Sequence, residues 1–371
     1  MPDVGAKVVG GAAGAPGDGH AETPGAVHTE LLDAGSPTPP PHVIGDVDGG
    51  MQYTTAAPGQ IVRIVASDFH TCAALEDERV LCWGVNPSAE NNLDVAHRSD
   101  TAEWVPWLRG AKELTSGRGH NCFLAPSGEA RCYGINYTGS LGDGTTRSTG
   151  KPQRVALSSN KKAVSFGLGI QFSSALMEDG SVQYWGGWAE TNLLPGTLEG
   201  LSDVTALSAA WHRGCALLRD QTVKCWTDYL VLEPTPAPVA ELQGAVQISV
   251  SETHGCAVLA SRELKCWSDG AASSVPGSQN VVSVAAGMYD TCAVLADGHV
   301  RCWHRSNGSL GEARDVPGVS EVKLLAGGSG HHCAVKRDDS VQCWGAGRDG
   351  QLGDGAGSDS SRPVHVLFPV E

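Results

Sequence analysis

The chain is 371 residues long and has a formal net charge of −15, with 26 lysines and arginines against 41 aspartates and glutamates. This balance argues against sequence-independent binding of nucleic-acid phosphates and against docking on an anionic membrane, since both need clustered cations. Glycine (48) and proline (20) are abundant, and no apolar run approaches the roughly 18 residues of a membrane span. We therefore expect a turn-rich protein that neither binds nucleic acid nor inserts into a membrane.

Residues 1–55 are rich in Gly, Ala, Pro and Asp and contain almost no aromatic residues. Such a segment cannot bury enough apolar surface to become ordered. We predict a disordered N-terminal tether over residues 1–55 and one folded domain over residues 56–371.

From about residue 60 onward the chain repeats itself. Seven units of the type HTCAALEDERVLCWG align on their first cysteine position at residues 72, 122, 174, 215, 256, 292 and 333. Short β-favouring runs precede each unit, among them IVRIVAS at 61–67 and VKLLAG at 322–327. Short strands in repeats of about 40 residues indicate propeller blades, and blades must close into a ring to bury their faces. The prediction is an all-β, seven-bladed propeller.

All cysteines occur in pairs with nine residues between the two members. The pairs are Cys72 and Cys82, Cys122 and Cys132, Cys215 and Cys225, Cys256 and Cys266, Cys292 and Cys302, and Cys333 and Cys343. The centre of each unit is typical of a three-residue hairpin loop, which places the paired positions directly across two antiparallel strands, about 4.5–5.5 Å apart. The third unit replaces both cysteines together, by Ser174 and Tyr184. We predict one cross-strand disulfide in six of the seven blades, and hence an oxidising compartment.

The loop between the first two strands of each unit begins with a small residue and then varies. Loops at equivalent places in a closed propeller open on one face, where aromatic and arginine side chains favour a protein interface. An alternative is that these side chains plug the central channel. The candidate binding residues are Phe69, Arg118, Phe172, Trp211, His212, Arg213, Met288, Tyr289 and Asp290.

Histidine stands two residues before the first cysteine in four units, at His70, His120, His254 and His331. These histidines could form a metal or proton-relay cluster, but four sites spread around seven blades need not converge. The Gly-Asp-Gly loops lack the ligand series of a calcium site. We assign no catalytic residue, metal ligand or cofactor.

Three motifs resemble the regulator of chromosome condensation repeat family. They are Gly117-x-x-His120, the strand–turn–strand that ends in an aromatic residue and Gly, and the tails Asn136-x-x-Gly-Ser-Leu-Gly-Asp-Gly144 and Gly350-Gln-Leu-Gly-Asp-Gly355. The resemblance implies a seven-bladed propeller. The family includes nuclear exchange factors for small GTPases and a secreted propeller that inhibits β-lactamases. The acidic charge and the cysteine pairs make this chain look like a bacterial, cysteine-paired version that is extracellular, periplasmic or attached to the envelope.

The sequence therefore predicts a non-catalytic, monomeric binding module for an unidentified protein or peptide. One alternative is an enzyme, a hydrolase or lyase that uses the histidine set in the propeller channel, with or without a metal. Another is a structural surface protein. The beginning of the sequence has neither a basic stretch nor an apolar core typical of a secretory signal, so the route of export stays open.

Overall fold

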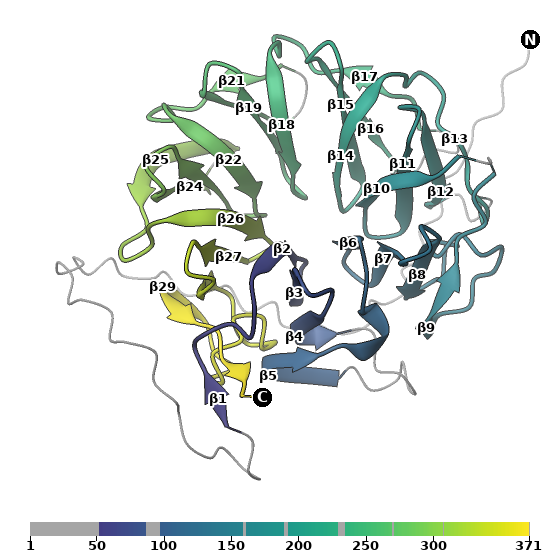
Figure 1. Ribbon diagram of the computed structural model, residues 1–371. Helices are drawn as coiled ribbons and strands as arrows, with labels where there is room; N and C mark the ends of the chain where they lie inside the picture. Colours follow the sequence, from purple (N-terminus) through teal and green to yellow (C-terminus); the bar gives the residue numbers. More distant parts are fainter. Residues whose placement is uncertain are drawn as a thin grey trace, which may run out of the picture. The chain divides into compact units, whose positions relative to one another are not determined.

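The structure is a computed structural model that describes residues 52–86, 97–158, 161–188, 192–228, 234–268, 271–306 and 308–370. Within these residues the chain forms seven four-stranded antiparallel sheets, each of them one blade of a propeller (Figure 1). The predicted all-β, seven-bladed fold is confirmed. No helix among these residues is long and apolar enough to cross a membrane.

Every blade consists of four strands that pair in the order in which they occur in the chain. The strands of blades 1 to 3 are β2 (Ile61–Ala66), β3 (His70–Leu75), β4 (Val80–Asn86), β5 (His97–Trp104); β6 (Glu113–Ser116), β7 (His120–Leu124), β8 (Ala130–Gly134), β9 (Thr149–Arg154); β10 (Ala163–Leu168), β11 (Phe172–Met177), β12 (Val182–Gly186) and β13 (Gly196–Thr197). A short 3-10 helix, η1 (Pro106–Leu108), follows blade 1.

Blades 4 to 7 repeat the same order. Their strands are β14 (Val204–Ala210), β15 (Arg213–Leu218), β16 (Val223–Thr227), β17 (Ala237–Pro238); β18 (Ala245–Val250), β19 (Gly255–Leu259), β20 (Leu264–Trp267), β21 (Ser273–Ser274); β22 (Val281–Ala286), β23 (Asp290–Leu295), β24 (Val300–Ser306), β25 (Ser309–Asp315); β26 (Val322–Gly327), β27 (His331–Lys336), β28 (Val341–Gly345) and β29 (Ser360–His365).

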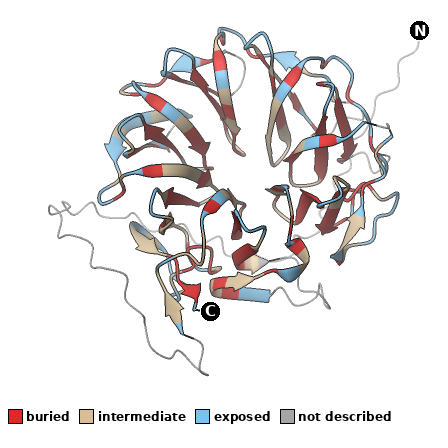
Figure 2. Cartoon of the chain, viewed as in Figure 1, coloured by how far each residue is buried: buried red, intermediate tan, exposed pale blue. Residues whose placement is uncertain are grey.

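The second strand of each blade is the most deeply buried element (Figure 2). It lies between two strands of its own sheet and is covered on both faces by neighbouring blades, which explains continuous apolar runs such as CAAL in β3 and CAVL in β19. One cluster of buried apolar side chains fills each of the seven interfaces between blades. The blades are therefore held together by burial against their neighbours.

The hairpin between the second and third strands has the predicted geometry in all seven blades. The residue after the midpoint of the turn has a positive φ throughout: it is glycine in blades 2, 3 and 6, with φ of 83°, 81° and 85°, and another residue in the remaining four, with φ of 64° to 71°. Gly128, Gly180 and Gly298 thus occupy the left-handed position of a three-residue hairpin loop, and four blades adopt it without glycine.

All six predicted disulfides are present, and the two cysteines of each lie directly opposite each other in the strand register. Their Cα atoms are 4.0–4.1 Å apart, closer than the expected separation of opposed residues. The bonds join Cys72 to Cys82, Cys122 to Cys132, Cys215 to Cys225, Cys256 to Cys266, Cys292 to Cys302, and Cys333 to Cys343. These twelve residues are therefore covalent links within single blades.

Blade 3 has no disulfide, and Ser174 and Tyr184 occupy its opposed positions. The Ser174 hydroxyl donates a hydrogen bond to the carbonyl of Gly167 (2.9 Å). Gly167 belongs to the first strand of the blade. In blade 3 a hydrogen bond between the first and second strands is therefore found in place of the disulfide that joins the second and third strands of the other blades.

The ring closes without a strand exchanged between the first and last blades. The first strand of blade 1 packs beside the first strand of blade 7, and β1 (Tyr53–Thr54) pairs with β30 (Phe368–Pro369) next to this junction. The amide of Ala102 in blade 1 donates to the carbonyl of Leu367 (3.0 Å). The C-terminal residues thus join the two ends of the ring. Residues 53 and 54 belong to the folded part, while the rest of the predicted tether up to residue 51 lies outside the described residues.

The fourth strand is long in some blades and very short in others. It has only two residues in β13, β17 and β21, which belong to three consecutive blades, 3, 4 and 5. The outer edge of these three blades is therefore thin.

Candidate binding face

The loops between first and second strands share one end of the propeller with the loops between third and fourth strands, because successive strands are antiparallel. On the axis at this end lies a cavity of about 70 Å³ lined by residues from all seven blades, which we call the channel mouth. Its volume would hold about two water molecules, at roughly 30 Å³ each. The mouth is thus too small for a substrate of ordinary size.

The constant small residue at the start of each first loop has a steric cause. A Cβ atom at Gly328 would lie 2.0 Å from the carbonyl oxygen of Ser67 in the next blade, and one at Gly169 would lie 2.4 Å from the carbonyl oxygen of Trp211. Seven loops converge on the axis, so only small residues fit where they meet. The small residue at this position is therefore a structural requirement.

The variable residues that follow form a polar and aromatic network over the mouth. The Arg118 guanidinium pairs with the Asp68 carboxylate (3.2 Å) and lies 4.6 Å from the centre of the Trp211 ring. The Ser329 hydroxyl donates to the same carboxylate (2.6 Å). Burial and the neighbouring Asp68 carboxylate raise the pKa of Glu252, which also lines the mouth. The charged side chains at the channel mouth are therefore fixed in place by contacts between residues of different blades.

Three of the predicted binding residues lie together at this mouth. The Phe69 ring centre is 5.7 Å from the Arg118 guanidinium, which also contacts Trp211. Trp211 is half-buried and has a φ of +50°. Trp211 and Arg118 line the channel mouth, while part of each side chain remains accessible.

The other predicted residues lie further from the axis. Tyr289 is 58% exposed and is the most exposed of the set, and Met288 is half-buried beside it. His212 binds the buried Asp228 carboxylate through Nδ1 (2.9 Å), and burial raises the pKa of Asp228. Arg213 begins β15 and is half-buried. These residues share the face, but they form separate contacts around it.

Phe172 is not a binding residue, and this prediction is wrong. Its side chain is fully buried and stacks on Tyr184, with 5.5 Å between ring centres, in the cluster between blades 3 and 4. The reason is its place: Phe172 is the first residue of β11, where the chain has left the loop and its side chain enters the interface between blades.

The histidines His70, His120, His254 and His331 stand at this same first position of the second strand, or one residue before it. Each is buried, and Nε2 of each meets the residue before the first cysteine position of the next blade. The four contacts are His70–Asn121 (3.0 Å), His120–Ser173 (2.8 Å), His254–Thr291 (2.6 Å) and His331–Thr71 (2.8 Å). Burial lowers the pKa of His70, His120 and His254 to about 4 and that of His331 to about 3. These histidines are neutral links between blades, each in a different interface.

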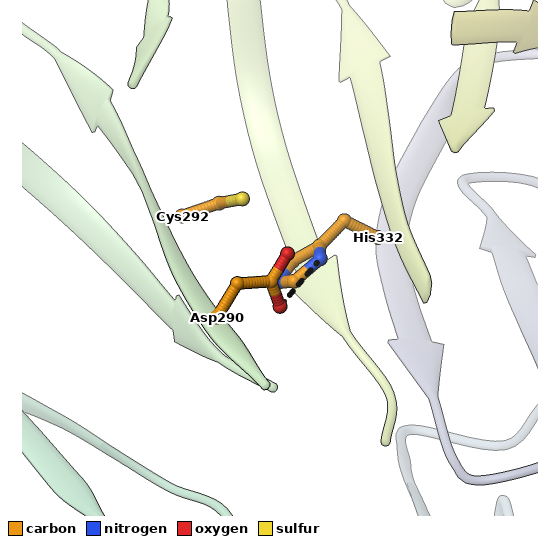
Figure 3. Close-up of side chains that lie close together, drawn as sticks. All are labelled: Asp290, Cys292 and His332. Atoms are coloured by element: carbon orange, nitrogen blue, oxygen red, sulfur yellow. Dashed lines mark ion pairs between the residues drawn. The ribbon is translucent and has the colours of Figure 1, made fainter. Parts of the chain in front are cut away.

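Blade 6 exchanges the two partners of this link. Asp290 occupies the histidine position, and His332 occupies the position before the cysteine of blade 7, with 3.7 Å between the Asp290 carboxylate and Nδ1 of His332 (Figure 3). Cys292 lies close to both side chains, and the three could resemble a metal site. The Cys292 sulfur is bonded to Cys302, however, and a disulfide sulfur offers no thiolate ligand. Asp290 thus belongs to an interface between blades.

The partners of the histidines were not found from the sequence. Asn121, Ser173, Thr291 and Thr71 each stand immediately before a cysteine position, so their polar character was visible in the alignment of the units. Units four and five carry Gly214 and Gly255 there, and the preceding units carry Phe172 and Arg213 in place of histidine. The signal in the sequence was that a unit with histidine at this position is followed by a unit with a polar residue before its cysteine position, whereas units three and four, which lack the histidine, are followed by units with glycine there. This correspondence can be interpreted only when the order of the blades around the ring is known.

A sequence profile described as the regulator of chromosome condensation (RCC1) repeat matches residues 61–88 and 322–351, which cover the first three strands of blades 1 and 7. With the seven blades, these matches make the chain similar to RCC1 propellers. It is 33% identical over 97 residues to the regulator of chromosome condensation of Mus musculus, an alignment that covers 26% of this chain and 23% of that protein. The aligned parts span only 12% to 32% of the curated relatives.

Solved structures show the same fold. Prp20p from Saccharomyces cerevisiae is 18% identical with a TM-score of 0.51, over 82% of this chain and 76% of that one. The ectodomain of the receptor kinase CR4 from Physcomitrella patens is 19% identical with a TM-score of 0.52, over 77% of this chain and 74% of that one. At this level of identity the likeness concerns the fold.

Proposed function

We propose that this chain is a protein-binding propeller that holds a partner protein or peptide against the face around the channel mouth. The observation that carries this proposal is the division within the first loops: small residues are constant where the loops meet, and the residues that follow are aromatic or charged and differ from blade to blade. Steric need explains the small residues. It does not explain Tyr289, which is 58% exposed on this face.

The nature of the relatives agrees with a binding role. Prp20p is known for its binding to Gsp1p and histones, and the yeast RCC1 protein has also been solved in complex with Kap60. Those partners belong to those proteins. The charge of −15 here makes an acidic or phosphate-rich partner unfavourable, so we propose a protein or peptide and not a nucleic acid.

We further propose that the protein works outside the reducing cytosol, as a monomer, in an extracellular, periplasmic or envelope setting, and that it is a bacterial, cysteine-paired version of the family. Six disulfides and the lack of any free cysteine support an oxidising environment. The enzymatic alternative would need histidines that converge on one cavity, whereas the four histidines lie in four different interfaces between blades.

The test is a double variant, Trp211→Ala with Tyr289→Ala. A partner is first captured from the envelope fraction of the source cells by cross-linking and identified by mass spectrometry, and its Kd is then measured with purified proteins. We expect the double variant to bind at least about 30-fold more weakly, as for two central aromatic contacts. The control is Arg219→Ala, since Arg219 is exposed on a hairpin turn at the opposite end. Unchanged affinity in the double variant would disprove the proposal.

A further inference from the structure

The loop between the third and fourth strands fills the interface with the next blade in two places. In blade 2, the carbonyl of Ser140 accepts a hydrogen bond from the indole N–H of Trp185 (2.8 Å). In blade 7, the carbonyl of Gln351 accepts one from the indole N–H of Trp83 (2.9 Å). The leucines that follow, Leu141 and Leu352, are fully buried. The sequence Gly-(Ser or Gln)-Leu-Gly thus supplies both an acceptor and an apolar side chain to the adjacent tryptophan.

The glycine after each leucine is part of this fit. A Cβ atom at Gly142 would lie 2.7 Å from Nε1 of Trp185, and one at Gly353 would lie 2.8 Å from Cδ1 of Trp83. The peptide backbone therefore lies directly on the indole ring, and only glycine permits this approach. In both interfaces the tryptophan of the next blade therefore contacts a backbone carbonyl, a buried leucine and a glycine.

The interface between blades 4 and 5 has the tryptophan without such a loop. Residues 227–236 of blade 4 contain no Gly-x-Leu-Gly sequence. The indole N–H of Trp267 at this interface is buried and has no acceptor among the described residues, as is that of Trp226 at the interface between blades 3 and 4. Trp226 and Trp267 are only 3% and 5% exposed, and their rings pack over the glycines of their own blades, Gly214 and Gly255. A buried donor without an acceptor is unfavourable, so the site favours a group that supplies one.

A groove of about 720 Å³ lies at this interface. Trp226, Pro238 and Val239 of blade 4 form one wall, and Trp267 and Ser268 of blade 5 lie on the other. Trp211 and Glu252 line both this groove and the channel mouth, so the groove is continuous with the proposed binding face. Its volume is about ten times that of the mouth and falls in the range of pockets that bind small ligands or peptide side chains.

We propose that this groove binds a segment of the partner protein in which a leucine is flanked by small residues, of the type Gly-Ser-Leu-Gly, folded into the same turn as residues 139–142, where the amide of Gly142 donates to the carbonyl of Gly139 (2.9 Å). A backbone carbonyl of the segment accepts the indole N–H of Trp267, and the leucine enters the groove, as Ser140 and Leu141 do against Trp185. In two other interfaces a loop of this chain makes the same contact with a tryptophan, Trp185 and Trp83. The inference deepens the proposed function and depends on it, because it names the chemistry of the segment that the partner presents.

The probe is a capped synthetic peptide, TGSLGDG, which copies residues 138–144 of this chain. It is titrated into the full chain labelled with 15N at its tryptophans, and the indole N–H resonances are followed by NMR. We expect a saturable downfield shift of the Trp267 resonance. A peptide with alanine in place of leucine is expected to bind at least about tenfold more weakly, because it loses the buried side chain. Trp267→Phe, which keeps a ring but removes the donor, is expected to weaken binding about fivefold.

The matched control is Trp185→Phe, because the Trp185 donor already has its acceptor within the chain. This variant is expected to bind the peptide with unchanged affinity. The proposal is overturned if the peptide does not shift the Trp267 resonance, whether or not it shifts that of Trp226. It is also overturned if the shift occurs only after residues 229–233 are replaced by a Gly–Ser linker, since the chain would then cover the groove itself.

The two proposals fail in different ways. If the peptide does not bind but the Trp211→Ala, Tyr289→Ala double variant still loses the whole partner, the groove is disproved and the binding face stands. If the peptide binds through Trp267 but that double variant binds the partner normally, the channel mouth is disproved as the contact surface and the groove alone remains.

Discussion

A single position, at the start of the second strand, determines how each blade meets the next. Histidine at this position forms a neutral hydrogen bond across the interface in four blades, and phenylalanine in blade 3 packs there instead. The loop residue one or two positions earlier is exposed or half-buried. Two neighbouring positions in the chain thus have different roles: the side chain at the start of the second strand is buried between blades, whereas that of the preceding loop residue lies on the face of the propeller.

The buried histidines make stability depend on pH. Their pKa values are lowered from about 6.5 in the unfolded chain to about 4 for His70, His120 and His254. Their contribution is fully present above pH 6.5, and it is lost as the pH falls toward 4 because the unfolded chain binds protons that the folded chain cannot accept. A shift of this size corresponds to roughly 3 kcal/mol for each histidine.

We expect His120→Gln to reduce this pH dependence. Glutamine can keep a hydrogen bond to Ser173 but does not titrate, so the free energy of unfolding should fall by roughly 3 kcal/mol less between pH 7 and pH 4 than in the wild type. Urea unfolding at several pH values measures the difference. His299→Gln is the control, since His299 is exposed on a hairpin turn and lies outside the interfaces between blades. Parallel pH curves for wild type and His120→Gln would contradict the explanation.

At the scale of the element, the hairpin with its disulfide is the unit that repeats. The turn geometry and the opposed cysteines depend on residues within about 15 positions of one another. Local information of this kind is present in one sequence, which is why the hairpins and all six disulfides could be predicted. The paired loss of cysteine in unit three favoured links within single blades.

Removal of one disulfide should have a local and moderate effect. For Cys292→Ala with Cys302→Ala, the entropy of the closed loop predicts a loss of about 3 kcal/mol in the free energy of unfolding. Urea unfolding under non-reducing conditions measures it. Ser174→Ala in blade 3 is the comparison, because it removes only a hydrogen bond to Gly167 and should cost about 1 kcal/mol. Equal losses in the two variants would show that the covalent link adds nothing beyond local bonding.

At the scale of the whole molecule, the sequence was less informative because the decisive contacts join distant residues. His331 meets Thr71, and Trp83 meets Gln351, across more than 250 positions of the chain. The residues opposite each histidine and the groove between blades 4 and 5 follow from the order of the blades around the axis. Phe172 was misplaced for the same reason, since only the adjacent blade shows that its side chain enters an interface. The resemblance to a repeat family predicted the ring, but not these pairs.

The junction between blades 7 and 1 differs from the other six because no covalent connection of short length crosses it. Besides the histidine and tryptophan contacts, it depends on the C-terminal residues: Phe368 is fully buried and packs edge-on against Trp83, with 6.3 Å between ring centres. β30 also pairs with β1 at the same place. In a propeller each blade is stabilised by its two neighbours, so opening one junction exposes a face of two blades at once.

Phe368→Ala should therefore weaken the ring at one defined place. The loss of a buried phenylalanine costs about 3–5 kcal/mol, and the exposed cavity lies between blades 7 and 1. Hydrogen exchange followed by mass spectrometry should show faster exchange in β2–β4 and β26–β28 before any other strands. Phe166→Ala removes a similar ring from the interface between blades 2 and 3 and should accelerate exchange there instead. If both variants accelerate exchange equally around the whole ring, the propeller unfolds as one cooperative unit, and the junction is no weaker than the other interfaces.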